Sequence, residues 1–394
     1  MATENLIPDY NILSGIPMIK DSVSNLENTV KERCNVILSN FTTCTFSIHL
    51  NTPAAGSPEH VLVRLESSSD RFSTVAALQK LAHFQLPDLV PRVLDVGKTS
   101  TAQGQRLEYS VTEFISNAIT LEQEWDKIDG PAQKDLMSSV IDAVSKLQNL
   151  TLDSEHAQKT LEGTSYYCDG KMAFIGGPEL GYHSDIAGFL AKLAGSASPD
   201  KTNFSATRTS NSFVVESKIE NVDRVELTSS DLVELRKHVV FCHDDLEPRN
   251  ILIKRDNAHS GKWNIAAIID WEMAGFFPFA YEYGHKDAEL GSSNLHFTYY
   301  TLFKEQSRHL LAGGKSAMKL LEALRAMDVS KKSCPTKNVS RRFQARWLER
   351  EKVELSPDVQ VGWVRKAGVE DVGVFTKQEN EDIEMEILKE LGYV

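Results

Sequence analysis

The chain has 394 residues, 41% of them hydrophobic, so we expect one large domain or two ordinary domains with a sizeable core. Its 55 acidic and 43 basic side chains give a formal net charge of −12, which argues against broad binding to nucleic acid or anionic membranes. The same acidity mildly favours cationic partners.

The cysteines and the N-terminal segment indicate a reduced compartment. The sequence shows neither a C-x-x-C pair nor an even cysteine count, so neither a disulfide framework nor a zinc site is expected. Residues 1–20 carry acidic side chains where a signal peptide needs basic ones, and no apolar stretch approaches eighteen residues. We therefore expect a cytoplasmic protein, although the nucleus also fits.

The front of the chain predicts β-structure. Residues 34–50 and 60–66 are rich in β-branched and aromatic side chains and predict strands, separated by the turn-forming segment NTPAAGSPE. Residues 71–84 place apolar side chains near helical spacing and predict a helix that crosses between strands. Residues 106–116 predict a further strand, after which the pattern changes.

Behind residue 116 the patterns are mostly helical. Residues 131–150 begin with a proline suited to the first helical turn and carry an apolar stripe. Residues 183–195, with Ser184 as the expected cap, and residues 228–239 also predict helices. The polar region 196–221 predicts a loop.

The domain organisation follows from these patterns. Residues 331–350 carry seven basic side chains and one acidic, whereas residues 378–394 carry six acidic and one basic, which favours solvated helices that pair over a docking tail. The predicted parts are an N-terminal extension (1–33), an N-terminal nucleotide-binding lobe (34–116), a helical C-terminal lobe with the catalytic loop (117–330) and a helical, charged C-terminal extension (331–394).

The most informative stretch is FCHDDLEPRNILI, residues 241–253, together with the strand NIAAIID that ends in Asp270. His243 lies two residues before Asp245, Asn250 five residues after it, and Asp270 twenty residues after Asn250. Phosphoryl transfer needs a carboxylate near the acceptor hydroxyl and two oxygen ligands that hold magnesium against nucleotide phosphates. Asp245 fits the first role, and Asn250 with Asp270 the second.

These two segments resemble a known family. FCHDDLEPRNILI followed by AAIIDWEMAGFFPFAYEY looks like the aminoglycoside phosphotransferase and choline kinase-like family, especially its fungal members with the extended Asp-Trp-Glu segment. The resemblance covers about residues 35–300 in organisation and is specific at 241–284. It implies an α+β, bilobal protein-kinase-like fold, with a β-rich N-terminal lobe and a mainly helical C-terminal lobe, and an enzyme that uses ATP and Mg²⁺.

Roles follow from the resemblance residue by residue. It implies that Asp245 is the catalytic base, that His243 positions the loop, and that Asn250 and Asp270 are the magnesium ligands. Arg64 in VLVRL takes the place of the phosphate-binding lysine. The segment VTEFI takes the place of the hinge that hydrogen-bonds adenine, and its implied nucleotide-binding residues are Glu113, Phe114 and Ile115.

The sequence departs from the family pattern at four places. An arginine replaces the lysine at position 64, and its planar head is not equivalent to an ammonium group. Thr74 stands where a glutamate usually holds that cation, with Asp70 the nearest carboxylate. Asp244 replaces a common glycine beside the proposed base, and the turn SNFTTC over the nucleotide has no glycine.

Each residue also has a plainer interpretation. Asp245 alone is more often a loop residue that bonds local backbone groups, although its joint spacing favours phosphotransfer. Arg64 alone is more often a surface cation of an edge strand, and Glu272 is a metal-site group or, as we favour, a salt-bridge partner. Cys242 and Trp271 are expected to be buried packing residues. The same packing role is expected for Phe276, Phe277, Phe279, Tyr281 and Tyr283, with a substrate wall as the alternative.

The sequence thus predicts an ATP-dependent phosphotransferase that acts on a small-molecule hydroxyl, which the net acidity suggests is cationic. No Ala-Pro-Glu sequence follows Asp270, which argues against protein substrates. The competing hypothesis is a nucleotide-binding pseudokinase without turnover. The intact Asp245, Asn250 and Asp270 favour the enzyme.

Overall fold

The structure is a computed structural model that divides into two compact units, each described here by itself. The first unit comprises residues 1–118, 153–171 and 266–272, and the second comprises 119–152, 172–265 and 273–394. Asp70 and most of the segment NTPAAGSPE lie outside the described residues. The structure describes residues 5–23, 33–50, 58–67, 71–168, 171–195, 202–256, 261–334, 336–369 and 372–394.

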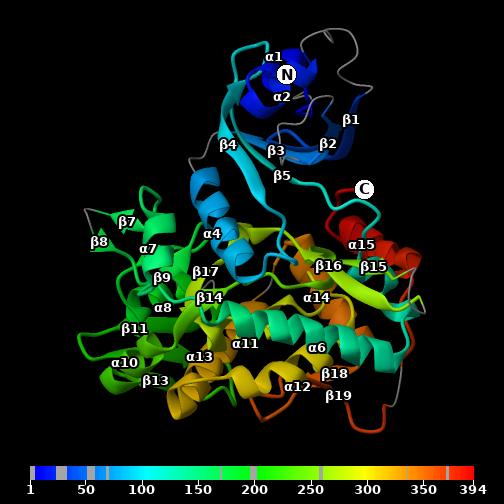
Figure 1. The fold of residues 1–394 in the computed structure, drawn as a ribbon. Helices are drawn as coiled ribbons and strands as arrows, with labels where there is room; N and C mark the ends of the chain where they lie inside the picture. The colour runs from blue at the N-terminus through cyan, green and yellow to red at the C-terminus, as the bar shows by residue number, and fades with distance from the viewer. Residues whose placement is uncertain are drawn as a thin grey trace. The chain divides into compact units, whose positions relative to one another are not determined.

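The first unit is built on one antiparallel sheet of five strands in the order β1-β2-β3-β5-β4 (Figure 1). The sheet places Arg64 on β3, between β2 and β5, with its alternate neighbours Val63 and Leu65 buried in the core. Its strands are β1 (Cys34–Ser39), β2 (Thr43–His49), β3 (His60–Ser67), β4 (Val93–Ser100) and β5 (Arg106–Glu113).

Helices cover this sheet and extend its core. The helices of this unit are α1 (Tyr10–Ser14), α2 (Pro17–Val23), α4 (Phe72–Gln85) and α7 (Glu155–Leu161). Ile12 and Leu13 of α1 are fully buried in the same cluster as Phe46 and Val63 of the sheet. The N-terminal segment before the sheet therefore contributes to its hydrophobic core.

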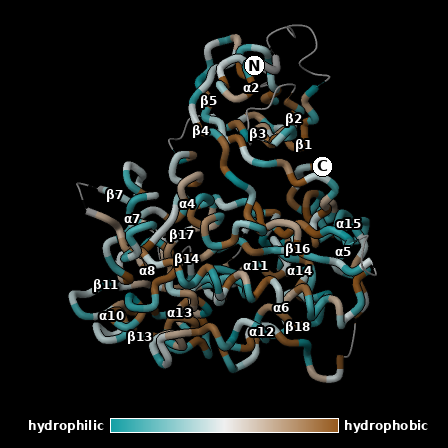
Figure 2. Tube along the Cα trace, viewed as in Figure 1, coloured by the Kyte–Doolittle hydropathy of each residue, from teal (hydrophilic) through white to brown (hydrophobic). Residues whose placement is uncertain are grey.

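The helices of the second unit follow the expected amphipathic patterns. In Figure 2 hydrophobic and hydrophilic residues alternate along α6, whose buried side includes Leu136, Val140 and Val144. The longer helices of this unit are α6 (Gly130–Leu147), α8 (Ile186–Ala194), α10 (Ser229–Lys237), α11 (Phe279–Glu289), α12 (Phe297–Ser307), α13 (Gly314–Lys332), α14 (Val339–Arg350) and α15 (Lys377–Glu390).

Short strands and turns of the second unit carry the loop of interest. A four-stranded sheet has the order β10-β9-β17-β14, and a three-stranded sheet the order β16-β15-β6. The polar loop 243–247 and the 3₁₀ turn η2 connect β14 to β15. The bounds are β6 (Ile119–Thr120), α5 (Leu121–Glu124), η1 (Trp125–Lys127), β9 (Ile175–Gly177), β10 (Gly181–His183), β14 (Val239–Cys242), η2 (Pro248–Asn250), β15 (Ile251–Arg255), β16 (Trp263–Ile268), η3 (Trp271–Met273) and β17 (Gly275–Pro278).

The remaining elements are short. A second three-stranded sheet has the order β11-β12-β13, and two two-stranded pairs are formed by β7 with β8 and by β18 with β19. Their bounds are β7 (Tyr167–Cys168), β8 (Lys171–Met172), β11 (Phe204–Arg208), β12 (Ser212–Ser217), β13 (Val225–Thr228), η4 (Arg308–Leu310), β18 (Val353–Leu355) and β19 (Trp363–Arg365).

Two expectations about elements were wrong, and one was confirmed. Residues 34–50 form β1 and β2, which the expected turn at SNFTTC joins, because Asn40 accepts hydrogen bonds from the N–H groups of Thr42 and Thr43. The region 196–221 is not a loop: its described residues include β11 and β12, which pair with each other. The cap of α8 is Asp185, whose carboxylate accepts from Gly188 N–H at 2.7 Å, and not Ser184.

The expected pairing of the charged C-terminal segments is confirmed. Arg346 of α14 lies 3.1 Å from Glu386 of α15 and also contacts Glu390, while Arg350 Nη2 donates to Asn380 at 2.6 Å. Among the described residues no helix is long and apolar enough to cross a membrane.

Candidate functional site

Arg64 is the centre of an ion-pair network in the first unit. Its Nη1 lies 3.1 Å from Asp270 Oδ1, and its Nη2 lies 2.6 Å from Glu272 Oε2 and 2.8 Å from Glu66 Oε1. Arg71 also contacts Glu66 at 2.9 Å and Glu272 at 3.1 Å. Two arginines therefore face three carboxylates, which leaves this network with one formal negative charge in excess.

This network orients the Arg64 guanidinium in place of the glutamate that the family pattern has at position 74. Thr74 of α4 is fully buried and its hydroxyl oxygen accepts from Ser165 N–H at 3.3 Å, so α4 supplies no carboxylate at that position. Glu66 on β3 itself and Glu272 after β16 hold Arg64 instead. Burial disfavours the charged guanidinium, but Glu272, Asp270 and Glu66 outweigh this effect and raise the pKa of Arg64.

The backbone around Asp270 is held in an uncommon conformation. Asp270 has a φ of +65°, a left-handed value that is uncommon for a residue with a side chain. Ile268 N–H donates to Leu89 O at 2.7 Å before this turn, and Trp271 Nε1 donates back to Ile268 O at 3.1 Å. Trp271 is 1% exposed, which confirms its expected packing role and explains how the turn is anchored.

The backbone N–H groups of the expected hinge residues Glu113, Phe114 and Ile115 differ in whether they already donate a hydrogen bond. The N–H of Glu113 donates to Arg92 O at 3.1 Å, and the N–H of Phe114 donates to His60 O at 3.3 Å. In the part of the chain that the structure describes, the N–H of Ile115 has no acceptor. The Phe114 ring lies 4.1 Å from the His60 ring, which in turn stacks on His49 at 4.0 Å.

The loop residues of the second unit gather around Asp245. Arg249 Nη2 lies 2.6 and 2.7 Å from the two carboxylate oxygens of Asp245, whose side chain is 14% exposed. Asn250 Nδ2 donates to Asp245 Oδ2 and to its backbone carbonyl, both at 2.8 Å. His243 is buried, and its Nδ1 accepts from Asp245 N–H at 3.3 Å. The structure thus brings His243, Asp245 and Asn250 together.

Buried charges of α11 lie beneath this loop. Asp244 is 3% exposed, has a φ of +60°, and its Oδ1 lies 3.3 Å from His285 Nδ1. Burial raises the pKa of Asp244. Burial works against a charged His285, but Asp244, together with Glu289 at 3.1 Å, raises the pKa of His285 well above its ordinary value. The position where glycine is common therefore belongs to a buried ion pair.

A second buried pair fixes the middle of the loop. Lys286 Nζ lies 2.6 Å from Glu247 Oε1 and donates to Leu246 O at 2.6 Å, and both side chains are at most 4% exposed. Tyr299 of α12 donates to the same carbonyl at 2.8 Å. Helices α11 and α12 therefore clamp the backbone that carries Asp245.

The plainer sequence interpretations of the neighbouring residues are confirmed. Cys242 is 1% exposed, and burial raises the pKa of its thiol well above the ordinary value, so it lacks the thiolate character of a nucleophile. The four cysteines whose side chains are described are free thiols. The aromatic residues expected to pack are all buried: Phe276, Phe277, Phe279, Tyr281 and Tyr283.

Three residues of these ion-pair networks were not identified from the sequence. Arg249 was not singled out, although the spacing of four residues from Asp245 is typical of an ion pair on one turn. Glu66 lies two residues from Arg64 and therefore on the same face of β3, which was a usable signal. Arg71 precedes α4 and contacts both Glu66, five residues away, and Glu272, 201 residues away, and the second contact had no local signal.

The residues proposed to hold magnesium have suitable donor atoms. Asn250 uses its amide nitrogen on Asp245, which leaves its carbonyl oxygen as an acceptor. Asp270 uses Oδ1 on Arg64, and in the described residues its Oδ2 has no hydrogen-bond donor. Carboxylate and amide oxygens are the ligands that Mg²⁺ prefers, so each residue fits a hard cation.

Among comparisons with known proteins, one family profile matches most of the chain. Residues 52–285, more than half of the chain, match the profile of the phosphotransferase enzyme family. No curated protein sequence matches the chain. Among solved structures, the ternary complex of APH(2″)-IIa with streptomycin and ATP is similar over 79% of this chain and 97% of its own, with 12% identity and a TM-score of 0.39.

The expected α+β, protein-kinase-like class is confirmed, with an N-terminal antiparallel sheet followed by a mostly helical region. Nothing in the comparisons singles out fungal members. The chain belongs to the phosphotransferase enzyme family.

Proposed function

We propose that this protein transfers a phosphoryl group from ATP to a hydroxyl of a small molecule. The observation that supports this most strongly is the hydrogen-bonding of Asp245. Asn250 and His243 orient its carboxylate and backbone, and Arg249 balances its charge, within a loop that helices clamp from below. A carboxylate held in this way is suited to accept the proton of an attacking hydroxyl.

Arg64 is proposed to contact the phosphates. A guanidinium has five N–H donors, and Arg64 directs three of them to Glu66, Asp270 and Glu272, while its Nη2 also lies 2.8 Å from Glu66 Oε1. One Nη1 hydrogen is therefore available to a phosphate oxygen without breaking the pairs that orient the group. Ile115, with its free N–H, is the hinge residue proposed to bond adenine, beside the Phe114 ring.

Asn250 and Asp270 are proposed to bind magnesium through their free oxygens. The bound metal would neutralise charge on the phosphates. The protein's part is to present these oxygens, and Asp270 must then share its carboxylate between the cation and Arg64. The excess negative charge of the Arg64 network favours an incoming cation at this position.

The acceptor is proposed to bind a groove of about 970 Å³ in the second unit. Arg249, which holds Asp245, also donates to Ser293 O at 2.8 Å, and residues 295–298 that follow line the groove. Five carboxylates and three lysine or arginine side chains line it, beside three phenylalanines, which favours a cationic acceptor. The carboxylates are those of Glu122, Asp126, Glu351, Glu381 and Glu384.

Nucleotide binding tests the proposal first. ATP should raise the unfolding temperature, and magnesium should enlarge the shift, because a ligand that binds only the folded state stabilises it. ATP consumption is then measured with amino alcohols, aminoglycosides and neutral sugars, with Asp245→Asn as the inactive control. Absence of any shift with ATP and magnesium would refute the proposal.

A nucleotide-binding protein without turnover is the second candidate. The ion pair between Arg64 and Asp270 favours it, since a metal must compete with an arginine for the same carboxylate. The two candidates differ in one measurement: both bind ATP, but only the enzyme shows acceptor-dependent ADP formation that Asp245→Asn abolishes.

A further inference from the structure

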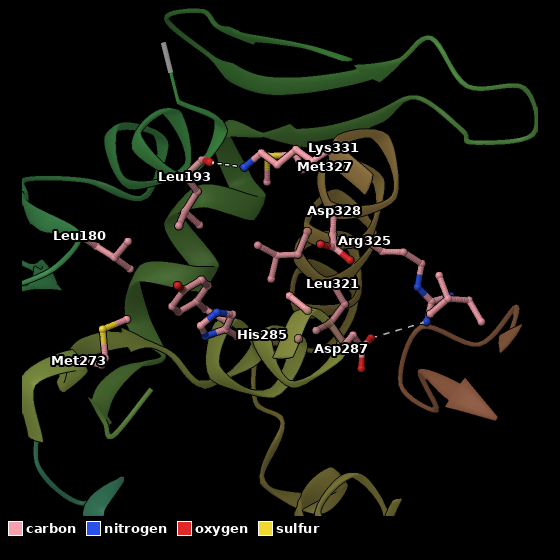
Figure 3. A pocket seen from close by; sticks show the side chains of 15 residues that line it. Leu180, Leu193, Met273, His285, Asp287, Leu321, Arg325, Met327, Asp328 and Lys331 are labelled. Atoms are coloured by element: carbon pink, nitrogen blue, oxygen red, sulfur yellow. Dashed lines mark hydrogen bonds and ion pairs between the residues drawn. The ribbon is translucent and has the colours of Figure 1, made fainter. Parts of the chain in front are cut away.

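A separate cavity of about 270 Å³ lies in the second unit, between α8, α11 and α13 (Figure 3). Its walls are mainly apolar, and Figure 3 shows Lys331 at the end near Leu193 and His285 closer to Leu180 and Met273. The apolar lining residues include Leu180, Leu193, Met273, Leu321, Leu324 and Met327. None of the residues assigned above to nucleotide, metal or acceptor binding lines this cavity.

The charges on the cavity wall are balanced except at one end. Asp287 pairs with Lys304 at 2.9 Å, and Asp328 pairs with Lys332 at 2.8 Å. Lys331 Nζ donates to Leu193 O at 2.9 Å, and within the described residues no carboxylate oxygen lies in ion-pair range of it. Burial lowers the pKa of Lys331, and the nearby Asp328 only partly opposes this effect.

We propose that this cavity binds a small apolar carboxylic acid, with its carboxylate on Lys331, and that Tyr281 and His285 transmit its occupancy to the catalytic loop. The apolar walls suit a hydrocarbon body. The Lys331 ammonium group donates to Leu193 O and lies over the Phe204 ring, but among the described residues it has no carboxylate in ion-pair range, so it selects an anion over a neutral or cationic head. A cavity of this size is near the small end of about 300–1,000 Å³ for ligand pockets, so the body is short. Octanoate is a suitable probe.

The connection to the loop is a chain of contacts. Tyr281 and His285 line the cavity and stack with ring centroids 5.6 Å apart. His285 Nδ1 lies 3.3 Å from Asp244, which is covalently joined to Asp245 and has a left-handed backbone. A ligand that packs against these rings restrains the side chain that holds Asp244. The second half of this proposal rests on the proposed role of the loop, but binding itself does not.

Calorimetric titration of the full chain tests the binding. Octanoate, octanol and octylamine are compared below the concentrations at which they form micelles. Octanoate should bind most tightly of the three. Lys331→Met should weaken the binding of octanoate by about 10- to 100-fold, because a charge-assisted contact is lost, and should leave the affinity for octanol unchanged. Ala288 is half-buried on α11 and lines the cavity, so Ala288→Leu narrows it. This variant should weaken the binding of octanoate and of octanol together.

Hydrogen exchange tests the transmission without relying on catalysis. Saturating octanoate should slow amide exchange at residues 243–250 in the wild type and leave it unchanged in Ala288→Leu. Equal affinity of octanoate in wild type and Lys331→Met overturns the assigned head group. Binding without any change at residues 243–250 overturns the transmission, and absence of saturable binding overturns the site, whatever the phosphotransferase assays show.

Discussion

Lys286→Met should destabilise the protein strongly, because it leaves the carboxylate of Glu247 buried without a partner. Lys286 and Glu247 are 4% and 1% exposed and their charged atoms are 2.6 Å apart, so solvent screens the pair little. Removing one partner of a buried pair typically costs about 3–5 kcal/mol. Methionine keeps a long apolar stem beside Phe303, so the loss reports the charge and its hydrogen bond to Leu246 O more than packing.

The assay is equilibrium unfolding in urea at two pH values. Burial already raises the pKa of Glu247, and removal of Lys286 raises it further, so the folded state then favours the protonated acid. Stability in the variant is accordingly lost as the pH rises above the unfolded pKa, and the deficit should be larger at pH 8 than at pH 5. The double variant Lys286→Met/Glu247→Gln should recover most of the loss. A single-variant loss under about 1 kcal/mol, or no recovery, would refute the reasoning.

Two further predictions concern the site, and a third concerns Glu282, a buried residue of α11. Arg64→Ala should weaken ATP binding by about 1.5–3 kcal/mol and acceptor binding less, and an unchanged ATP dissociation constant would exclude Arg64 as a phosphate ligand. Asp245→Asn should cut turnover by about 10²- to 10⁴-fold with ATP affinity kept, whereas Asp270→Asn should raise the magnesium requirement; identical magnesium titrations would contradict this division. Burial raises the pKa of Glu282 to about 7. Because this acid keeps its proton to a higher pH in the folded than in the unfolded chain, stability falls as pH rises from its unfolded pKa through 7, and Glu282→Gln should stabilise the protein at pH 8 by roughly 3 kcal/mol and little at pH 4, as urea unfolding would show.

The sequence predicted elements whose pattern is local and regular. Helices α4, α6 and α10 have apolar stripes and turn signals at their ends, and the structure confirms them. Strand β4 was missed, because VLDVGKTS alternates poorly and its formation depends on pairing with β5. Strands β11 and β12 were taken for loop because most residues of the region 196–221 are polar, although Phe204 and Phe213 are buried.

The site was predictable where the spacing is short. His243, Asp245 and Asn250 lie on one loop, and the structure brings them together as expected. The contact between Arg64 and Asp270 was not predictable. These residues lie 206 positions apart, and the local sequence carries no signal for a hydrogen bond over that separation. Glu272 was favoured as a salt-bridge partner, and this interpretation is confirmed by its contact with Arg64.

The placement of these carboxylates bears on how the missing glutamate of α4 is compensated. Glu272 is two residues from Asp270, so one short segment supplies both a carboxylate that orients Arg64 and the proposed metal ligand. Glu66 belongs to the same strand as Arg64 and is fixed to it by the sheet register. The orientation of the arginine therefore depends on the sheet and the turn after β16 rather than on the position of α4. A glutamate at position 74 would gain little, because Thr74 is fully buried and Arg64 already lies in ion-pair range of three carboxylates.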